Sequence, residues 1–244
     1  MKTTDVTDAQ LPRGAGSSTD DVTPVPAAST IVLRGDPFEV LLIRRSENSR
    51  FAPGAWVFPG GAVEDDDRAS TIAERDETMA LRICAVRELF EETGILPGRN
   101  AEDLRRFRRE LLGRRTKFED LYPDGWPVFD ELVWTARWIT PVGVPKRFDT
   151  WFFLLSVDEG TVAESENSEC VETLWIRPEE ALRRERAEKL SLLFPTIKNL
   201  EAIATAASSS ALLDSRRHAQ IRTVKPVLIV EGNRKRIVLP EGEV

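Results

Sequence analysis

Short apolar runs and apolar residues at helical spacing divide the sequence into predicted strands and helices. Two β-branched runs, residues 29–34 and 38–43, flank Gly35-Asp36-Pro37 and predict a β-hairpin. Apolar residues that recur every three or four positions predict a helix over residues 77–93, which Gly94 ends as a C-cap. Further strands are predicted at residues 55–58, 128–139, 149–157, 171–176, 224–230 and 236–239, and further helices at 101–112, from 178 onward and at 192–207. This mixture predicts an α/β (α+β) sandwich with a mixed sheet.

The two ends of the chain differ in composition from its middle. Residues 1–27 are rich in Thr, Ser, Asp, Pro and Gly, and would bury too little apolar surface to offset the entropy of ordering. We therefore expect a flexible tail over residues 1–27 and a globular domain over residues 28–207. Residues 208–244 are expected to form an extension that packs on this domain.

Charge and cysteine content argue against several classes of function. The formal net charge of −7 argues against a nucleic-acid partner. A basic stretch at residues 105–115 is explained by a solvated helix face, with a phosphate or RNA contact as the alternative. Cys84 and Cys170 form no C-x-x-C motif, which argues against a zinc site or a disulfide and favours a reducing cytoplasm. No apolar run approaches the roughly 20 residues of a membrane helix, so no membrane partner is expected.

The single histidine limits the chemistry that the chain can perform. His218 lies in a polar stretch near the end of the chain and is expected at the surface. Serine–histidine or cysteine–histidine catalysis would have to use this residue, which no catalytic motif surrounds. We therefore expect carboxylates to carry the chemistry.

Three carboxylates lie on one side of the helix predicted over residues 77–93. Glu88, Glu91 and Glu92 are spaced by three and four residues, whereas the apolar residues of the helix gather on the opposite side. Like charges at this spacing repel one another. A magnesium ion would turn the repulsion into attraction, because it prefers oxygen ligands. The alternative is an ordinary solvated acidic helix face.

The residues around these glutamates carry a resemblance to a known family. Residues 87–95 match the second half of the Nudix box, R-E-U-x-E-E-x-G-U with U a bulky aliphatic, at every defined position, and residues 58–61 (Phe-Pro-Gly-Gly) resemble its glycine-rich opening. The resemblance implies a Nudix-type α/β/α sandwich with a loop–helix–loop catalytic motif. It also implies that Mg²⁺ or Mn²⁺ is bound by the three glutamates and by the backbone carbonyl of Gly60. Arg87 would orient the neighbouring glutamate.

Two features of the box are left open by the sequence. The family pattern has fourteen residue steps from the first box glycine to the arginine, whereas Gly61 to Arg87 covers twenty-six, and Met79 stands where a glutamate is expected. The missing acid could be supplied by Glu64, one of residues 65–67, Glu74 or Glu77. A later loop often adds a catalytic carboxylate in this family, for which Glu169 is favoured over Glu166 and Glu172.

A second resemblance concerns the substrate. Residues 41–61 resemble the signature of coenzyme A diphosphatases, L-L-T-x-R-[SA]-x3-R-x3-G-x3-F-P-G-G, from which only Ile43 departs, and residues 145–153 resemble the same branch. The implied reaction is cleavage of coenzyme A or acyl-coenzyme A to 3′,5′-ADP and (acyl-)4′-phosphopantetheine. Arginine suits phosphate binding and aromatic rings suit adenine. The residues expected to contact this small-molecule substrate are Arg45, Arg50, Gly61, Trp138 and Arg147.

Two alternatives to this function remain at the level of the sequence. The first is a diphosphatase for NADH, FAD, a dinucleoside polyphosphate or a capped RNA. The second is a catalytically silent Nudix module that senses a nucleotide, for which the loss of box glutamates would be typical. A homodimer is compatible with the sequence, which says nothing more about assembly.

Overall fold

The computed structural model describes residues 2–16, 22–49, 51–69, 78–96, 104–122, 129, 131–165 and 170–239. Its strands are β1 (Lys2–Val6), β2 (Val25–Arg34), β3 (Glu39–Arg45), β4 (Trp56–Val57), β5 (Gly60–Ala62), β6 (Val133–Ile139), β7 (Phe148–Val157), β8 (Cys170–Ile176), β9 (Thr223–Val224), β10 (Val227–Glu231) and β11 (Arg234–Leu239). Its helices are α1 (Asp65–Ala69), α2 (Met79–Thr93), α3 (Leu104–Leu112), α4 (Pro178–Arg186), α5 (Phe194–Ile203), α6 (Ser209–Arg217) and the 3-10 helices η1 (Asp8–Gln10) and η3 (Phe118–Leu121).

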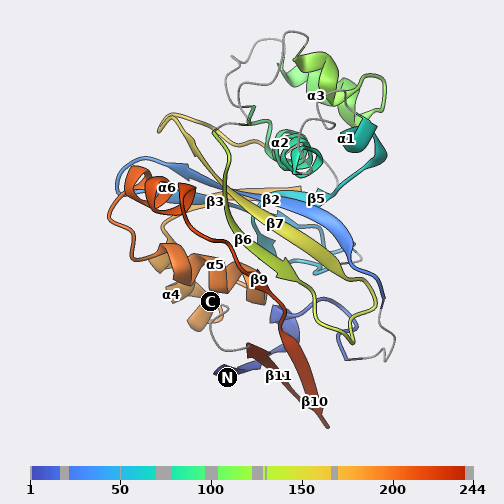
Figure 1. Cartoon of the computed structure of the whole chain (residues 1–244), viewed down its shortest axis with the longest axis vertical. Coiled ribbons are helices and arrows are strands. Elements are labelled where there is room, and N and C mark those ends of the chain that lie inside the picture. Colours follow the sequence, from blue (N-terminus) through green and yellow to red (C-terminus); the bar gives the residue numbers. More distant parts are fainter. Residues whose placement is uncertain are drawn as a thin grey trace.

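A large mixed sheet forms the middle layer of the protein. Its strand order is β4-β3-β2-β7-β6-β9, with β5 paired to β2 and β8 paired to β3. The pairs β2–β7 and β6–β9 are parallel, and the other pairs in this sheet are antiparallel. Helices α2 and α3 lie on one face of the sheet and α4 and α5 on the other (Figure 1). The predicted α/β/α sandwich with a mixed sheet is therefore confirmed.

The central strands bury residues on both faces because each face is covered by helices. In β2, Ile31 packs in the core on the side of α5, and Val32 packs in the core on the side of α2. In β7, Leu154 packs in the core on the side of α5, and Phe153 packs in the core on the side of α2. Such strands are apolar at consecutive positions, which is typical of a sheet covered on both faces.

The local predictions around the site are confirmed. Strands β2 and β3 form the expected hairpin, with Leu33 opposite Val40. Helix α2 begins at Met79, two residues later than expected, and ends at Gly94, whose φ of 73° is left-handed. The Gly94 N–H donates to the carbonyl of Phe90 at 2.8 Å. This glycine allows the chain to leave the helix at the end of the catalytic motif.

Two predicted elements have different bounds in the structure. The strand expected at residues 224–230 is split into β9, which pairs with β6, and β10, which pairs with β11 in a separate sheet. Pro226 lies between the two strands and has no N–H for a continuous ladder. The strand expected at residues 128–139 is regular only from Val133.

The N-terminal residues contain regular structure, in contrast to the flexible tail expected for residues 1–27. Strand β1 pairs antiparallel with β11, and β11 pairs with β10, in a second sheet of three strands. Leu11 is 5% exposed, and the Gly16 N–H donates to the carbonyl of Gly143 at 2.7 Å. The partner of β1 lies about 230 residues away in the sequence, beyond the reach of local pattern analysis.

The C-terminal residues also pack against the main sheet. Leu212 of α6 and Val224 of β9 are buried in the core on the side of α5. The division of the chain at residue 207 into a domain and an extension stays a prediction.

Replacement of Phe153 with Ala should lower the free energy of unfolding by about 3–5 kcal/mol. Phe153 is 0% exposed and packs between β7 and α2, so its loss leaves a cavity in the core. Urea unfolding followed by circular dichroism measures the change. Val162→Ala is the matched control, because Val162 is 71% exposed and its truncation should change stability by less than about 0.5 kcal/mol. Equal stability of the two variants would contradict this packing.

Candidate functional site

Helix α2 presents the three expected carboxylates at the edge of the core and not in open solvent. Its apolar residues Val86, Leu89 and Phe90 are fully buried on the side of the sheet. The side chains of Glu88 and Glu91 are only 15% and 21% exposed, and Glu92 is 3% exposed. Buried carboxylates are costly unless they are paired. The alternative of an ordinary solvated acidic face is therefore wrong.

The glycine-rich loop packs tightly against the carboxylates. The Gly60 N–H donates to Oε2 of Glu92 at 2.8 Å. A Cβ atom on Gly60 would collide with the backbone of Ala28 and Ser29 in β2, and one on Gly61 would collide with the carboxyl group of Glu88. Position 60 therefore requires glycine, because β2 passes too close for a side chain, whereas a side chain at position 61 would have to displace the carboxylate of Glu88.

Arg87 holds the acidic cluster together. Its guanidinium is 5% exposed and donates to Glu88 at 2.9 Å, to Glu91 at 3.2 Å and to the carbonyl of Ala62 at 3.1 Å. It also makes a two-pronged contact with Asp67, with Nε at 2.8 Å from Oδ1 and Nη2 at 2.9 Å from Oδ2. Burial acts to lower the pKa of Arg87, but the bond to Asp67 and the charge of Glu88 hold that pKa above its usual range. Arg87 therefore orients two of the glutamates.

Asp67 is the candidate for the missing acid that contacts Arg87, and the candidates Glu74 and Glu77 lie outside the described residues. In the family pattern the first glycine lies fourteen positions before the arginine, and the first acid lies eight positions before it. The acid therefore lies six positions after the glycine. Counted back from Arg87 this position is Met79, but counted forward from Gly61 it is Asp67. The insertion follows Asp67, so only the forward count finds it. Asp67 is 1% exposed and also accepts from the N–H of Glu64 at 2.8 Å.

The close approach of the acids changes their titration. Burial raises the pKa of Glu88 to about 7, against the lowering effect of Arg87, and the charge of Glu91 raises it further. Burial also raises the pKa of Glu91, and the charges of Glu64 and Asp67 act in the same direction. Arg87 thus compensates only part of the negative charge, and a further cation would stabilise the ionised cluster.

The donor chemistry of this cluster fits a divalent cation. Glu88, Glu91 and Glu92 line a cavity of about 870 Å³ on the side of α3, which we call the helix-side cavity. Carboxylate oxygens are the ligands that Mg²⁺ and Mn²⁺ prefer. Across the described residues, however, no three acidic, histidine or cysteine side chains converge on one point as a formed metal site. The three metal ligands, and the carbonyl of Gly60 as a fourth, therefore stay predictions.

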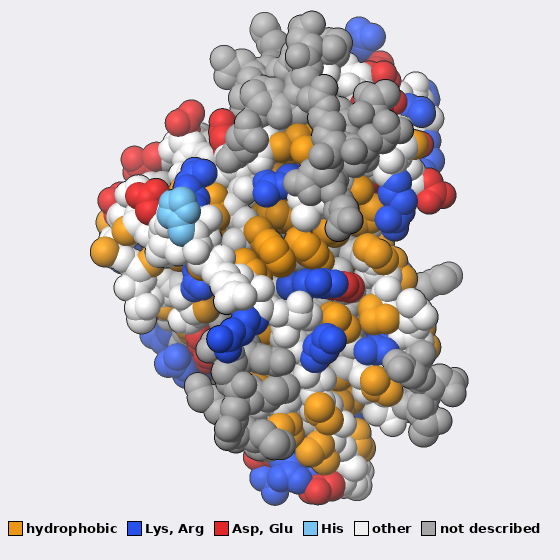
Figure 2. All heavy atoms as spheres, viewed as in Figure 1, with side chains coloured by type: hydrophobic (Ala, Val, Ile, Leu, Met, Phe, Trp, Pro, Cys, Tyr) orange, Lys and Arg blue, Asp and Glu red, His pale blue; other side chains and the backbone are white. Residues whose placement is uncertain are grey.

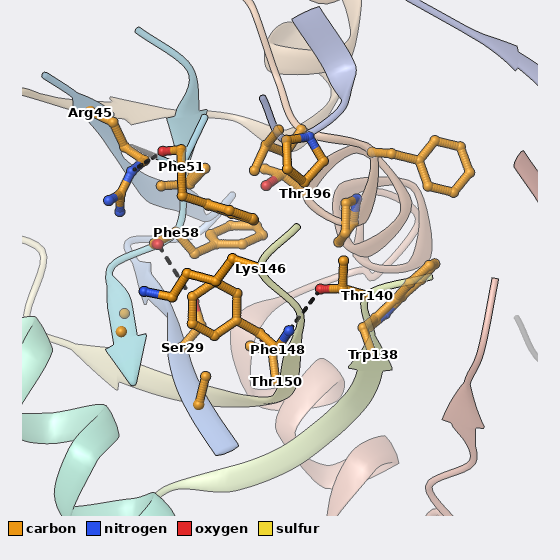
Figure 3. A pocket seen from close by; sticks show the side chains of 18 of the residues that line it. Ser29, Arg45, Phe51, Phe58, Trp138, Thr140, Lys146, Phe148, Thr150 and Thr196 are labelled. Carbon is orange, nitrogen blue, oxygen red and sulfur yellow. Dashed lines mark hydrogen bonds between the residues drawn. The ribbon is translucent and has the colours of Figure 1, made fainter. Parts of the chain in front are cut away.

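A second cavity begins at the same glutamate. This cavity of about 660 Å³, which we call the sheet-side cavity, is lined by Glu88 and the glycine-rich loop at one end and by residues of β6, α5 and β11 elsewhere. Figure 3 shows Arg45 and Lys146 on the side of Phe58, and Trp138 on the opposite side. Glu88 thus lies where the two cavities meet.

Three of the expected substrate residues line the sheet-side cavity: Arg45, Gly61 and Trp138. Arg45 also donates to the carbonyl of Phe51 at 3.0 Å and to Ser49. Arg147 is not among the described lining residues and donates to the carbonyls of Thr140 and Val22, both at 2.9 Å. Its neighbour Lys146, which sequence reasoning missed, lines the cavity instead. Arg50 and Glu169 lie outside the described residues.

The basic stretch at residues 105–115 includes one buried arginine. Arg108 of α3 is 2% exposed and donates twice to the backbone carbonyl of Glu91, at 3.1 and 2.9 Å. One arginine of the stretch at residues 105–115 is therefore a core residue, which charge alone did not indicate. His218 is exposed, as expected (Figure 2).

The NUDIX domain family model matches residues 23–196, more than half of the chain. The chain belongs to the Nudix hydrolase family. The match spans the acidic cluster, Asp67 and the glycine-rich loop. No helix in the described part of this Nudix protein has the length and apolar character to cross a membrane.

Individual relatives agree with this assignment. A solved Nudix hydrolase from Alicyclobacillus acidocaldarius is 27% identical, with a TM-score of 0.64 over 82% of this chain and 100% of that one. A Caenorhabditis elegans protein with a nudix hydrolase name is 34% identical over 181 residues, or 71% of this chain and 58% of that protein. Human acyl-coenzyme A diphosphatase NUDT19 is 28% identical over 240 residues, or 72% of this chain and 63% of NUDT19. The chain spans about three fifths of the length of these curated relatives.

Replacement of Asp67 with Ala should lower the free energy of unfolding by about 3–5 kcal/mol, because Arg87 loses its two-pronged partner while still buried. Chemical denaturation measures the change. Asp66→Ala serves as the control, since the side chain of Asp66 is 65% exposed and its ion pair with Lys117 should contribute less than about 1 kcal/mol. An Asp67→Ala protein as stable as the wild type would show that Arg87 does not depend on this carboxylate.

Proposed function

We propose that this Nudix protein hydrolyses the diphosphate bond of coenzyme A or acyl-coenzyme A. The proposal rests on the position of Glu88, where the carboxylate-lined helix-side cavity meets the sheet-side cavity, which Arg45 and Lys146 also line. A diphosphate at this junction would lie between the predicted metal site and Arg45 and Lys146. The names of the NUDT19 relatives from human and Xenopus laevis describe acyl-coenzyme A diphosphatases, which supports the same substrate.

The chemistry divides between the cation and the protein. A bound divalent cation would neutralise the diphosphate and lower the pKa of a bound water. Arg87 holds Glu88 and Glu91 in place, and the Gly60 N–H fixes Glu92, so that the carboxylates are preorganised before the substrate binds. Addition of one water across the diphosphate bond gives 3′,5′-ADP and 4′-phosphopantetheine, or its acylated form. Whether the cation is Mg²⁺ or Mn²⁺ stays open.

The cations on the sheet-side cavity suit a substrate with several phosphates. Arg45 is held by Ser49 and by the carbonyl of Phe51, and Lys146 lies with its ammonium 4.9 Å from the ring centroid of Phe148. Arginine binds phosphate through paired donors, and lysine acts as a point charge. The two cations therefore support recognition of the diphosphate and the 3′-phosphate.

The cytoplasmic location and a homodimer stay predictions from the sequence.

A substrate panel tests the proposal directly. Initial rates on coenzyme A, acyl-coenzyme A, NADH, FAD, ADP-ribose, a dinucleoside polyphosphate and a capped RNA would be measured with product identification by mass spectrometry, with and without a chelator. We expect chelator-sensitive release of 3′,5′-ADP from the coenzyme A species at the highest kcat/KM. Faster cleavage of another nucleotide would assign that substrate instead. No turnover of any of them, with nucleotide binding retained, would favour a sensing module.

Replacement of Glu92 with Gln should lower kcat by at least about 10³-fold, because it removes a charge from the predicted metal site. Gln keeps an oxygen that accepts the Gly60 N–H, so the unfolding free energy should change little. Mg²⁺ binding followed by calorimetry should weaken in parallel. Glu201→Gln is the control, because Glu201 is exposed on α5 and pairs with Lys198. A Glu92→Gln enzyme with near-normal turnover would remove Glu92 from the catalytic set.

A further inference from the structure

The end of the sheet-side cavity that lies away from the glycine-rich loop is lined by uncharged side chains, several of them apolar, with Thr140 beside Trp138 (Figure 3). Trp138 of β6 and Phe194 of α5 meet edge to face, with ring centroids 6.2 Å apart. Leu11 and Ile237 also line the cavity and are 5% and 1% exposed. These four residues, which we call the apolar end, belong to one continuous core cluster.

The topology of the chain places Leu11 and Ile237 near Trp138. Strand β9 pairs with β6 at Trp138, and the chain continues through Pro226, another lining residue, into β10. Strand β10 pairs with β11, where Ile237 lies opposite Leu228, and β11 pairs with β1. Figure 1 shows this second sheet on the side of the main sheet opposite α2. Two of the four residues of the apolar end, Leu11 and Ile237, therefore come from the two terminal parts of the chain.

The N-terminal part of this wall is anchored to the body of the protein. Nε2 of Gln10 donates to Glu185 of α4 at 2.7 Å. Lys235 of β11 pairs with Asp8 at 2.6 Å, and β1 pairs with β11 along all five of its residues. Leu11 follows these contacts directly in the sequence. The position of Leu11 at the cavity is thus fixed by the contacts of the residues that precede it.

Charge is confined to the other end of the cavity. Among the described residues that line it, the charged ones are Arg45, Glu88 and Lys146. In Figure 3 the ammonium of Lys146 points toward the side of Phe58, away from Trp138. Lys198, whose ammonium lies 5.5 Å from the ring centroid of Phe194, pairs with Glu201 and is not among the described lining residues. A phosphate placed at the apolar end would therefore lose its hydration without gaining a cation of the cavity wall. An uncharged, apolar group would instead gain from leaving water.

We propose that the apolar end receives the acyl chain of an acyl-coenzyme A, and that Leu11 and Ile237 limit the length of chain accepted. This inference rests on the proposed coenzyme A diphosphatase function and assigns a part of the substrate to a part of the cavity. The diphosphate lies at the end with Glu88, and the acyl-pantetheine arm extends toward Trp138. Each methylene that becomes buried should raise kcat/KM by about fourfold until the cavity is filled.

The test uses the full chain and a series of coenzyme A, acetyl-, hexanoyl- and decanoyl-coenzyme A. The measured quantity is the ratio of kcat/KM for each acyl-coenzyme A to kcat/KM for free coenzyme A. In the wild type this ratio should rise with chain length up to a maximum. In Leu11→Trp the ratio for hexanoyl- and decanoyl-coenzyme A should fall at least tenfold, because the indole fills the apolar end. In Leu11→Ala the maximum should move to a longer chain.

Val227→Trp is the matched control for the added indole. Val227 lies on β10 in the same small sheet and is 54% exposed, so this variant should keep the wild-type ratios. The unfolding midpoint of each variant shows whether the small sheet is intact. If Leu11→Trp does not fold, Leu11→Ala alone tests the acyl assignment, through the acyl-chain length at which its kcat/KM ratio is highest.

The outcomes separate the inference from the function on which it rests. A wild type that cleaves no coenzyme A species overturns both. A wild type that cleaves them, with ratios unaffected by Leu11→Trp and Leu11→Ala, overturns only the acyl assignment. A Leu11→Trp enzyme that loses activity equally on free and acylated coenzyme A also overturns it, because the apolar end would then hold the nucleotide.

Discussion

The site depends on one buried cation surrounded by acids. Arg87 donates to Asp67, Glu88 and Glu91 at once and also reaches the carbonyl of Ala62, so that a single guanidinium connects α1, α2 and the strand after the glycine-rich loop. Without it, the acids brought together by the fold would repel one another in a poorly hydrated place. The planar guanidinium suits this position because its five donors serve several acceptors at fixed angles, which a lysine ammonium does not provide.

This arrangement also explains why the acidic cluster is suited to binding a further cation. Arg87 supplies one positive charge to the three carboxylates of Asp67, Glu88 and Glu91, and the Gly60 N–H donates to Glu92. Burial raises the pKa values of Glu88 and Glu91, and the charges of neighbouring carboxylates raise them further. The arginine therefore fixes the geometry of the carboxylates and leaves part of their charge for a metal and its phosphate ligand.

The sequence predicted those parts of the fold and site that depend on neighbouring residues. The β2–β3 hairpin and helix α2 follow from local periodicity and from Gly35 and Gly94, which permit the turns. Asp67 could also have been found, because its distance from Gly61 is unaffected by the insertion that separates it from Arg87. Strand β1 could not, because its sequence Lys-Thr-Thr-Asp-Val has little apolar character and its partner is at the other end of the chain. The burial of Arg108 likewise depends on the carbonyl of Glu91, seventeen residues away, and not on any local pattern.

The acidic cluster is formed within one region of the sequence, whereas Leu11 and Ile237 are brought together from distant segments. The residues that hold the acidic cluster lie within the region shared with the Nudix family, residues 23–196. Leu11 and Ile237 lie outside that region, on segments joined by the pairing of β1 with β11. These two residues can change without disturbing Arg87 and its partners, because Leu11 and Ile237 pack in the core on the side of α5, whereas helix α2, which carries Arg87, packs in the core on the other side of the sheet. Under the proposed function, the length of the acyl chain would therefore be set by the ends of the protein chain, and the cleavage of the diphosphate by its middle.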